Sequence, residues 1–251
     1  MELSSKNFVY KLQGDMMNIP SNKILIAMVG LPGLGKSYFS KNLKRNYTKL
    51  NKQLNVKVFN AGEKRRVKKG EKQDAEWFKK QQKYKEQIAM DTLSDSINWL
   101  NKTKNNYCAI FDATNSTLDR RRNVYNKLQK YKNISLIFVE IQCDNKKIIE
   151  NNILHKIDSS PNYSTIKKSN AIRDFKKRID VYKKLYKTIS KQESEYNYIK
   201  VKLGNCMKYP RKQGELMCNN INPFFWLVDY VDNIPNYLKI DEKNSKLSSY
   251  K

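Results

Sequence analysis

The stretch Gly30-Leu31-Pro32-Gly33-Leu34-Gly35-Lys36-Ser37 decides the fold of this chain. It follows an apolar run at 24–29 and precedes a segment with helical spacing of apolar residues that starts at Tyr38. The pattern G-x-x-x-x-G-K-[ST] between a buried strand and a helix is the sequence of a phosphate-binding loop, the Walker A motif. Its glycines let successive backbone N–H groups converge on phosphate oxygens, and the start of the helix adds partial positive charge. We therefore expect the chain to bind a nucleoside triphosphate together with Mg²⁺.

Two side chains of this loop have distinct expected roles. Lys36 should reach the outer phosphates of the nucleotide, and the Ser37 hydroxyl should bind Mg²⁺. The other loop residues expected to contact the nucleotide are Gly30, Leu31, Pro32, Gly33, Leu34, Gly35 and Tyr38.

Strands and helices alternate along the rest of the chain. Apolar runs with β-rich composition predict strands at 23–29, 55–60, 107–111, 134–141 and 198–203. Helical spacing predicts helices at 38–50, 74–101, from after 115 to about 131, from 144 onward, at 167–189 and around 224–228. Residues 61–66 and 159–163 are expected to be loops. This order predicts an α/β protein with the fold of phosphate-loop (P-loop) nucleoside-triphosphate kinases, a mostly parallel sheet with helices on both faces. We expect an irregular leader at 1–22, one kinase domain at 23–235 and a polar tail at 236–251.

The chain is strongly basic. Among its 251 residues are 50 Lys and Arg against 24 Asp and Glu, a formal net charge of +26. Such a balance can indicate nucleic-acid binding or a general drift of composition toward lysine and asparagine. The charges are spread over many helices and form no arginine-rich tail, so we prefer drift combined with small anionic substrates and expect no nucleic-acid partner.

Neither a membrane segment nor a zinc site is expected. No apolar run approaches the length needed to span a bilayer, and the first residues lack the apolar core of a secretion signal. The four cysteines are far apart with no C-x-x-C pair, and His155, expected to be exposed on a helix, is the single histidine. Reduced thiols and the absent signal predict a cytoplasmic protein.

Polar side chains follow several predicted strands, at the sheet edge where such folds bind ligands. Asp112 follows strand 107–111, where it could hold the metal, accept a proton from an attacking hydroxyl, or cap the next helix. Arg65 and Arg66 follow strand 55–60 and could grip a second phosphate. Paired arginines in a protein with a phosphate loop favour a phosphorylated acceptor.

Several motifs in the same order resemble the kinase domain of the 6-phosphofructo-2-kinase/fructose-2,6-bisphosphatase family, over about residues 23–235. They comprise 28–32, 35–38, 58–66, 111–115, 143–144, 159–163, 174–179 and 198–201. The resemblance implies transfer of the γ-phosphoryl group of ATP to the 2-hydroxyl of fructose 6-phosphate. The main alternatives are another small-molecule or nucleic-acid-end kinase and a nucleotide-binding regulatory protein without catalysis.

The resemblance also implies roles for individual residues. Lys36, Asp112 and Lys156 would be catalytic, with Asp112 also a metal ligand. Asn152 would lie near the nucleotide and Cys143 near the site. The residues that would contact fructose 6-phosphate are Arg65, Thr114, Arg120, Arg178 and Tyr182.

The chain departs from the family pattern at several positions. Lys64 replaces a tyrosine, Asn162 an aspartate, and Lys85 an arginine expected at the sugar phosphate. The family lysine lies four residues before the loop proline, whereas Lys156 lies five before Pro161. Ile157, at the family position, falls on an apolar stripe. We expect the helix to end early, so that an extra loop residue brings Lys156 to the phosphates; the alternative is that the lysine is lost and the chain binds ATP but transfers phosphate poorly.

The phosphatase half of the family is missing from this sequence. That half uses an Arg-His-Gly motif, but the only histidine here, His155, follows Leu154. We expect no fructose-2,6-bisphosphatase activity from these residues. A homodimer, or a phosphatase domain on a longer native chain, is compatible with the resemblance.

Overall fold

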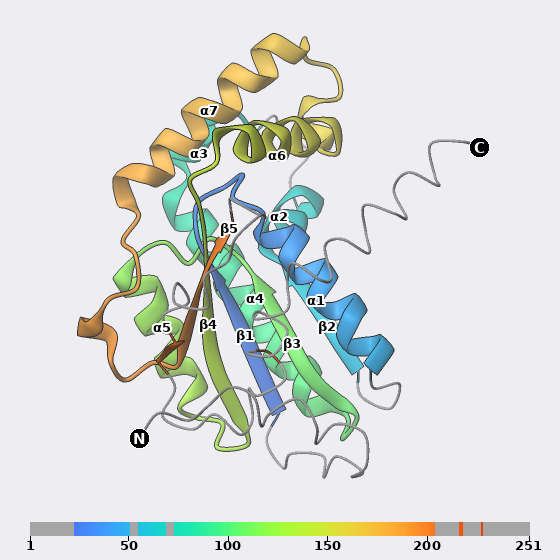
Figure 1. Ribbon diagram of the computed structural model, residues 1–251, viewed down its shortest axis with the longest axis vertical. Coiled ribbons are helices and arrows are strands. Elements are labelled where there is room, and N and C mark those ends of the chain that lie inside the picture. Colours follow the sequence, from blue (N-terminus) through green and yellow to red (C-terminus); the bar gives the residue numbers. More distant parts are fainter. Residues whose placement is uncertain (1–22, 51–54, 69–72, 204–215, 218–226, 228–251) are drawn as a thin grey trace, which may run out of the picture.

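A six-stranded sheet forms the centre of the computed structural model, which describes residues 23–50, 55–68, 73–203, 216–217 and 227 (Figure 1). The strand order is β2-β3-β1-β4-β5-β6. The strands are β1 (Lys23–Val29), β2 (Asn55–Asn60), β3 (Asn106–Asp112), β4 (Ile134–Cys143), β5 (Tyr198–Leu203) and β6 (Leu216–Met217). The pairs among β1 to β5 are parallel, and β6 pairs antiparallel with β5. The carboxyl ends of β1 to β5 therefore meet at one edge.

Helices cover both faces of this sheet because alternate residues of β1 point in opposite directions. Ile24, Ile26 and Met28 pack with α1 (Lys36–Leu50) on one face. Leu25, Ala27 and Val29 pack with α4 (Gln82–Lys102) and α5 (Leu118–Leu128) on the other. The predicted α/β fold is confirmed.

A smaller layer lies over the carboxyl edge of the sheet. It contains α3 (Ala75–Lys80), α6 (Lys146–Asp158), a 3₁₀ turn η2 (Pro161–Tyr163) and α7 (Lys168–Leu185). Figure 1 shows α3, α6 and α7 together above the strand ends. Their core consists of Ile153, Ile157, Tyr163, Ala171, Phe175 and Ile179. This layer has an apolar core of its own and covers the edge of the sheet where ligands are expected to bind.

The expected loop at 61–66 is wrong, because these residues form the helix α2 (Ala61–Lys68). Asn60 explains the difference. Its side-chain Oδ1 accepts the backbone N–H of Glu63 at 2.9 Å, which is the bond of a helix N-cap. The last residue of β2 thus starts a helix directly and places Arg65 and Arg66 on it.

The single long helix expected at 74–101 is also wrong, because the chain breaks at Gln81 into α3 and α4. Gln81 has φ −93° and ψ 44°, outside the helical region. Asp74 caps α3, since its Oδ1 accepts the Trp77 N–H at 3.0 Å. Asp174 of α7 accepts the N–H of Ala75 at 2.8 Å. α3 packs on α7 while α4 packs on β3, and one straight helix does not reach both.

Smaller differences concern the ends of elements. β4 extends to Cys143, and α6 begins at Lys146 after the N-cap Asn145 rather than at 144. α5 ends at Leu128 instead of 131. The expected leader 1–22, the tail 236–251 and all of 224–228 except Leu227 lie outside the described residues.

The helix α7 ends at Leu185 rather than at 189 because the following residues bind the sheet. Glu140 of β4 is fully buried and accepts three hydrogen bonds from this segment. The donors are the Tyr186 hydroxyl, the Thr188 hydroxyl at 3.0 Å and the Ile189 N–H at 3.3 Å. These bonds fix the exit of α7 to the centre of the fold.

None of the helices within the described ranges is long and apolar enough to cross a membrane.

A buried ion pair joins the segment after β3 to the segment after α7. Arg121 is fully buried and makes two bonds of 2.7 Å to the carboxylate of Glu193. It also donates to the carbonyl oxygens of Asn115 at 3.1 Å and Lys187 at 2.9 Å. Arg121 belongs to α5, and the charge of its guanidinium group is therefore compensated inside the protein, on the α5 face of the sheet.

We predict that Glu193→Gln lowers the free energy of unfolding by about 3 kcal/mol, because it leaves the Arg121 charge buried without a counter-charge. The measurement is denaturant unfolding at pH 7. Glu150→Gln, at an exposed position of α6, is the matched control and should change stability by less than about 0.5 kcal/mol. Equal stability of the two variants would contradict the prediction.

Candidate active site

A cleft of about 930 Å³ lies at the carboxyl edge of the sheet, beneath α6 and α7. It gathers most residues that the sequence singled out. Those lining it are Pro32, Gly33, Gly35, Lys36, Ser37, Tyr38, Arg65, Asp112, Thr114, Arg120, Asn152, Lys156, Arg178 and Tyr182. Gly30, Leu31, Leu34 and Cys143 are not among its lining residues. Cys143 is buried at the end of β4, with its thiol 3.8 Å from the carbonyl oxygen of Asn145.

The phosphate loop is held close over the neighbouring strands. Gly30 has φ +139°, and a Cβ atom there would lie 2.6 Å from the carbonyl oxygen of Ile141. Its N–H donates to the carbonyl oxygen of Thr114 at 3.0 Å. Only glycine accommodates this approach, so the first residue of the motif fixes the loop against β4 and against the segment after β3.

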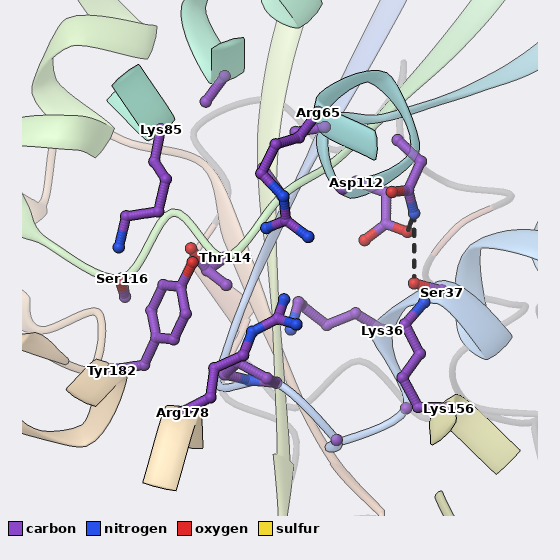
Figure 2. Close-up of a pocket in the computed structure, with 18 of the residues that line it drawn as sticks. Lys36, Ser37, Arg65, Lys85, Asp112, Thr114, Ser116, Lys156, Arg178 and Tyr182 are labelled. Carbon is purple, nitrogen blue, oxygen red and sulfur yellow. Dashed lines mark hydrogen bonds between the residues drawn. The ribbon is translucent and has the colours of Figure 1, made fainter. Parts of the chain in front are cut away.

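Lys36 is buried at the centre of the cleft. Its Nζ donates to the carbonyl oxygen of Leu31 at 2.8 Å. Burial lowers its pKa to about 8, against the opposing effect of Asp112, while Lys156 and Arg178 lower it further. Figure 2 shows the Lys36 side chain ending beside Arg178. An anion bound here would raise the pKa of Lys36 again, because it stabilises the charged form.

Asp112 and Ser37 are brought together by one amide. The Nδ2 of Asn60 donates to Asp112 Oδ2 at 2.5 Å and to the Ser37 hydroxyl at 3.4 Å (Figure 2). Asn60 and Asp112 are register partners at the ends of β2 and β3, which explains the contact. Burial raises the pKa of Asp112, although Lys36 and these hydrogen bonds oppose the shift. Asp112 has no helix-capping role among the bonds of the described residues.

Lys156 reaches the cleft without the early helix end that we expected. α6 continues through Lys156 to Asp158, and Ile157 packs inward in the core of the upper layer. Lys156 nevertheless lines the cleft, and Figure 2 shows its side chain directed toward the Ser37 and Asp112 end. Burial and then Arg66 lower its pKa, while Asp112 raises it. The helix itself, rather than an extra loop residue, delivers this cation.

Three cations surround the ring of Phe78 at the other end of the cleft. The guanidinium carbons of Arg178 and Arg65 lie 3.7 and 4.4 Å from the ring centroid, and Lys85 Nζ lies 5.3 Å away. Lys85 also donates to the Phe78 carbonyl oxygen at 2.6 Å and lies 5.0 Å from the Tyr182 ring centroid. Burial lowers the pKa of Lys85 to about 8.

The two arginines keep buried N–H groups without a partner. Arg65 Nε donates to Gln73 Oε1 at 2.6 Å, but Arg65 Nη2 and Arg178 Nε have no hydrogen bond although both atoms are buried. Burial and the neighbouring Arg178 lower the pKa of Arg65 to about 9, which leaves it charged at neutral pH. Buried donors of this kind are normally satisfied, so they indicate an anion site.

Arg120 differs from these cations because a carboxylate holds it. Glu86 of α4 receives Nε at 2.6 Å and also Nη2, in a two-pronged pair. Glu86 and Asp112 are the carboxylates among the described lining residues, against several Lys and Arg side chains. The cleft is therefore strongly cationic and suited to two phosphorylated ligands.

Sequence reasoning missed several residues of this cleft. Phe78 falls inside the single helix predicted at 74–101 and was given no role in the site, and Gln73 and Glu86 carry no motif. Asn60 belongs to a motif that resembles the family, but it was given no role. The available signal for Asn60 was that it is a polar residue at a strand end, next to Asp112 at the end of the neighbouring strand.

Comparisons with known proteins agree with the motifs. The family model described as 6-phosphofructo-2-kinase matches residues 13–226. A probable 6-phosphofructo-2-kinase of Schizosaccharomyces pombe is 36% identical over 191 residues, which are 73% of this chain and 28% of that protein. The 6-phosphofructo-2-kinase/fructose-2,6-bisphosphatase 3 of Homo sapiens is 32% identical over 189 residues, 73% of this chain and 36% of that protein. The chain thus spans about a third of the length of these relatives.

One solved structure, a fungal RNA kinase, aligns over 87% of this chain and 90% of its own at 14% identity and a TM-score of 0.47. This similarity is too low to bear on the function of the chain.

We predict that triphosphate binding takes up a proton at pH 8.5. The free Lys36, with a pKa of about 8, is then mostly neutral, and a bound polyanion raises its pKa and protonates it. The affinity for ATP should fall as pH rises above 8, and at pH 7, where Lys36 is charged in both states, no such dependence should remain. Calorimetry in buffers of different ionisation heat measures the uptake, which should be roughly three quarters of a proton for a pKa of about 8.

The matched control for this experiment is Lys41→Met, which changes a lysine that also lines the cleft, on α1. This variant should retain the proton uptake, whereas Lys36→Met should lose most of it. Proton uptake that is equal in Lys36→Met and in the unmodified chain would refute the assignment to Lys36.

Proposed function

Because this chain belongs to the 6-phosphofructo-2-kinase family, we propose that it transfers the γ-phosphoryl group of ATP to the 2-hydroxyl of fructose 6-phosphate. The products are ADP and fructose 2,6-bisphosphate. The observation that carries the proposal is the joining of a phosphate loop and a second cluster of incompletely bonded arginines in one cleft. A donor triphosphate and a phosphorylated acceptor need these two anion sites side by side.

The donor end consists of the phosphate loop and the inner face of α6. Loop N–H groups and Lys36 hold the phosphates, and Lys156 approaches them from the opposite side. Asn152 lies one turn before Lys156 on the same cleft-lining face of α6 and contacts the nucleoside. Burial lowers the pKa of both lysines because it penalises their positive charge. A bound polyanion supplies the missing counter-charge and stabilises their charged forms.

The oxygen atoms of Ser37 and Asp112 fit a magnesium ion. Magnesium prefers oxygen ligands and commonly takes one or two from the protein and the rest from phosphate and water. The Asn60 amide already gathers these two side chains at the mouth of the loop. A magnesium ion held by Ser37 and Asp112 together with ATP would neutralise charge on the outer phosphates.

The acceptor end consists of Arg65, Lys85 and Arg178, with Tyr182 and Thr114 beside them (Figure 2). The guanidinium groups of the two arginines, which line the cleft, bind the 6-phosphate of the sugar in charge-assisted bonds. Lys85 supplies a third charge as a point donor, without the flat two-pronged grip of an arginine. Arg120, held by Glu86, lies at the rim of the same end.

In the chemical step the sugar O2 forms a bond to the γ-phosphorus as the bond to the bridging oxygen of ADP breaks. The hydroxyl proton passes to the carboxylate of Asp112, which lines the cleft at the end of β3. Lys36 stabilises charge that develops on the transferred group, because it extends from the donor end toward Arg178 at the acceptor end. Catalysis consists mainly of positioning and charge neutralisation.

The buried thiol of Cys108, which forms no disulfide, supports a cytoplasmic location, where thiols stay reduced.

A product assay tests the proposal directly. ATP is supplied with fructose 6-phosphate, other sugar phosphates or oligonucleotides, and the phosphorylated atom is identified by phosphorus NMR. Formation of fructose 2,6-bisphosphate supports the proposal. Preferential phosphorylation of another sugar phosphate or of an oligonucleotide end, or ATP binding without turnover, overturns it.

We predict that Arg178→Gln raises the KM for fructose 6-phosphate about 10- to 100-fold, since charge-assisted hydrogen bonds contribute roughly 1.5–3 kcal/mol. The KM for ATP should stay within about twofold. Steady-state kinetics with each substrate varied in turn measures both. Arg173→Gln, at an exposed position of the same helix, is the control. Equal rises in both KM values would remove Arg178 from the acceptor site.

We predict that Lys156→Ala lowers kcat about 30- to 1000-fold at saturating substrates, because a cation at the transferred phosphoryl group contributes roughly 2–4 kcal/mol in the transition state. The exposed Lys147 of the same helix provides the control variant Lys147→Ala. A Lys156→Ala enzyme within about a factor of two of the unmodified chain would identify Lys156 as a surface charge.

A further inference from the structure

The cations of the acceptor end lie together although they repel one another. Arg178 lowers the pKa of both Arg65 and Lys85, and burial lowers each of them further. Folding must compensate this repulsion before any ligand binds. A neighbouring carboxylate would be the usual solution, since an ion pair satisfies both charge and hydrogen bonds.

A carboxylate at this position would prevent the site from binding a phosphate. It would occupy the N–H groups that a phosphate needs and cancel the charge that attracts it. Of the carboxylates lining the described part of the cleft, Asp112 is bound to Asn60 and Glu86 to Arg120. Neither is bonded to Arg65, Lys85 or Arg178 among the described bonds.

The face of an aromatic ring attracts a cation without accepting its in-plane hydrogen bonds. The Phe78 ring is fully buried, and the three cations lie 3.7 to 5.3 Å from its centroid. The nitrogen atoms Arg65 Nη2 and Arg178 Nε remain without partners beside it. The ring therefore compensates charge while it leaves hydrogen-bond donors free.

The position of Phe78 is fixed by several independent contacts. α3 is capped by Asp74 and tied to α7 by Asp174, which also accepts the Tyr163 hydroxyl at 2.9 Å. The Phe78 ring packs against the Tyr182 ring at 6.1 Å between centroids. The break at Gln81 frees α3 from the line of α4, so that it packs on α7, which carries Arg178.

We propose that Phe78 is a positioning residue of the acceptor site, which holds Arg65, Lys85 and Arg178 together so that their free N–H groups bind the phosphate of the acceptor. It does so through its π face and without touching the acceptor. This inference rests on the proposed function for the identity of the acceptor, but the phosphate-binding cluster is defined by the geometry alone.

The experiment weakens the π face while the shape of the ring is kept. Position 78 receives phenylalanine analogues with one, two and three fluorine atoms, which withdraw electron density from the ring face step by step. The KM for fructose 6-phosphate should rise with each step, to roughly tenfold for the trifluoro ring, as the loss of cation–π attraction implies. The KM for ATP, and kcat at saturating acceptor, should stay within about twofold.

A substitution by a natural amino acid and a control variant accompany the fluorinated series. Phe78→Leu keeps an apolar side chain without the π face and should raise the acceptor KM by at least as much as the trifluoro ring. Phe138→Leu removes another fully buried ring, in β4 and packed on Tyr196. It should lower the melting temperature without changing the acceptor KM. The fluorinated series keeps the test valid if Phe78→Leu does not fold.

A binding measurement separates this inference from the proposed function. Inorganic phosphate is titrated into the chain while a non-hydrolysable ATP analogue fills the phosphate loop. If fructose 6-phosphate is not an acceptor but phosphate affinity falls with fluorination, the inference stands and the proposed function fails. If fructose 6-phosphate is turned over but neither its KM nor phosphate affinity responds to fluorination, Phe78 is only a packing residue and the inference is overturned.

Discussion

Repulsion among cations is the constraint on which the arrangement of this cleft depends. Lys36, Lys156, Arg65, Lys85 and Arg178 are collected at one edge of a sheet, where burial makes their charges costly. No single device compensates them. Asp112 opposes the shift of Lys36 and Lys156 at one end, and an aromatic ring faces the other three cations at the other end. The remaining charge is left for ligands to neutralise.

Each cation comes from a different element, and this explains how the fold withstands the strain. The phosphate loop supplies Lys36, α2 supplies Arg65, α4 supplies Lys85, and α6 and α7 supply Lys156 and Arg178. The helices α1, α4, α6 and α7 are each anchored by buried apolar side chains. The ion pair between Arg121 and Glu193 contrasts with the cleft, because there a buried cation is fully neutralised. The molecule thus separates structural charges, which are paired, from ligand-binding charges, which are not.

The sequence predicted the sheet and the phosphate loop well, because both depend on local patterns. The run at 24–29 is apolar at every position, as a strand covered on both faces requires. The glycine motif carries its own backbone geometry, seen in the close approach of Gly30 to Ile141. Strand-end reasoning brought Arg65, Arg66 and Asp112 to one cleft, since the carboxyl ends of parallel strands converge.

Two of the errors in prediction, the single helix at 74–101 and the end of α7, came from contacts between segments far apart in the sequence. The spacing of apolar residues at 74–101 fits one helix, and the break at Gln81 depends on packing against α7, which begins 87 residues later at Lys168. The end of α7 depends on hydrogen bonds to Glu140 in a different strand. Lys156 lies one position away from the lysine of the family pattern. Helix rotation alone did not reveal that α6 can direct Lys156 into the cleft while Ile157 packs in the apolar core.

The helix α7 has a consequence for the thermodynamics of ligand binding. Its body is joined to α3 through Asp174, and its exit is bonded to the sheet through Glu140, so the span that carries Arg178 and Tyr182 is held on both sides. Side chains on such a span lose their conformational freedom when the chain folds. Little entropy is then left to lose when a ligand arrives, and the favourable enthalpy of the new hydrogen bonds is retained as affinity.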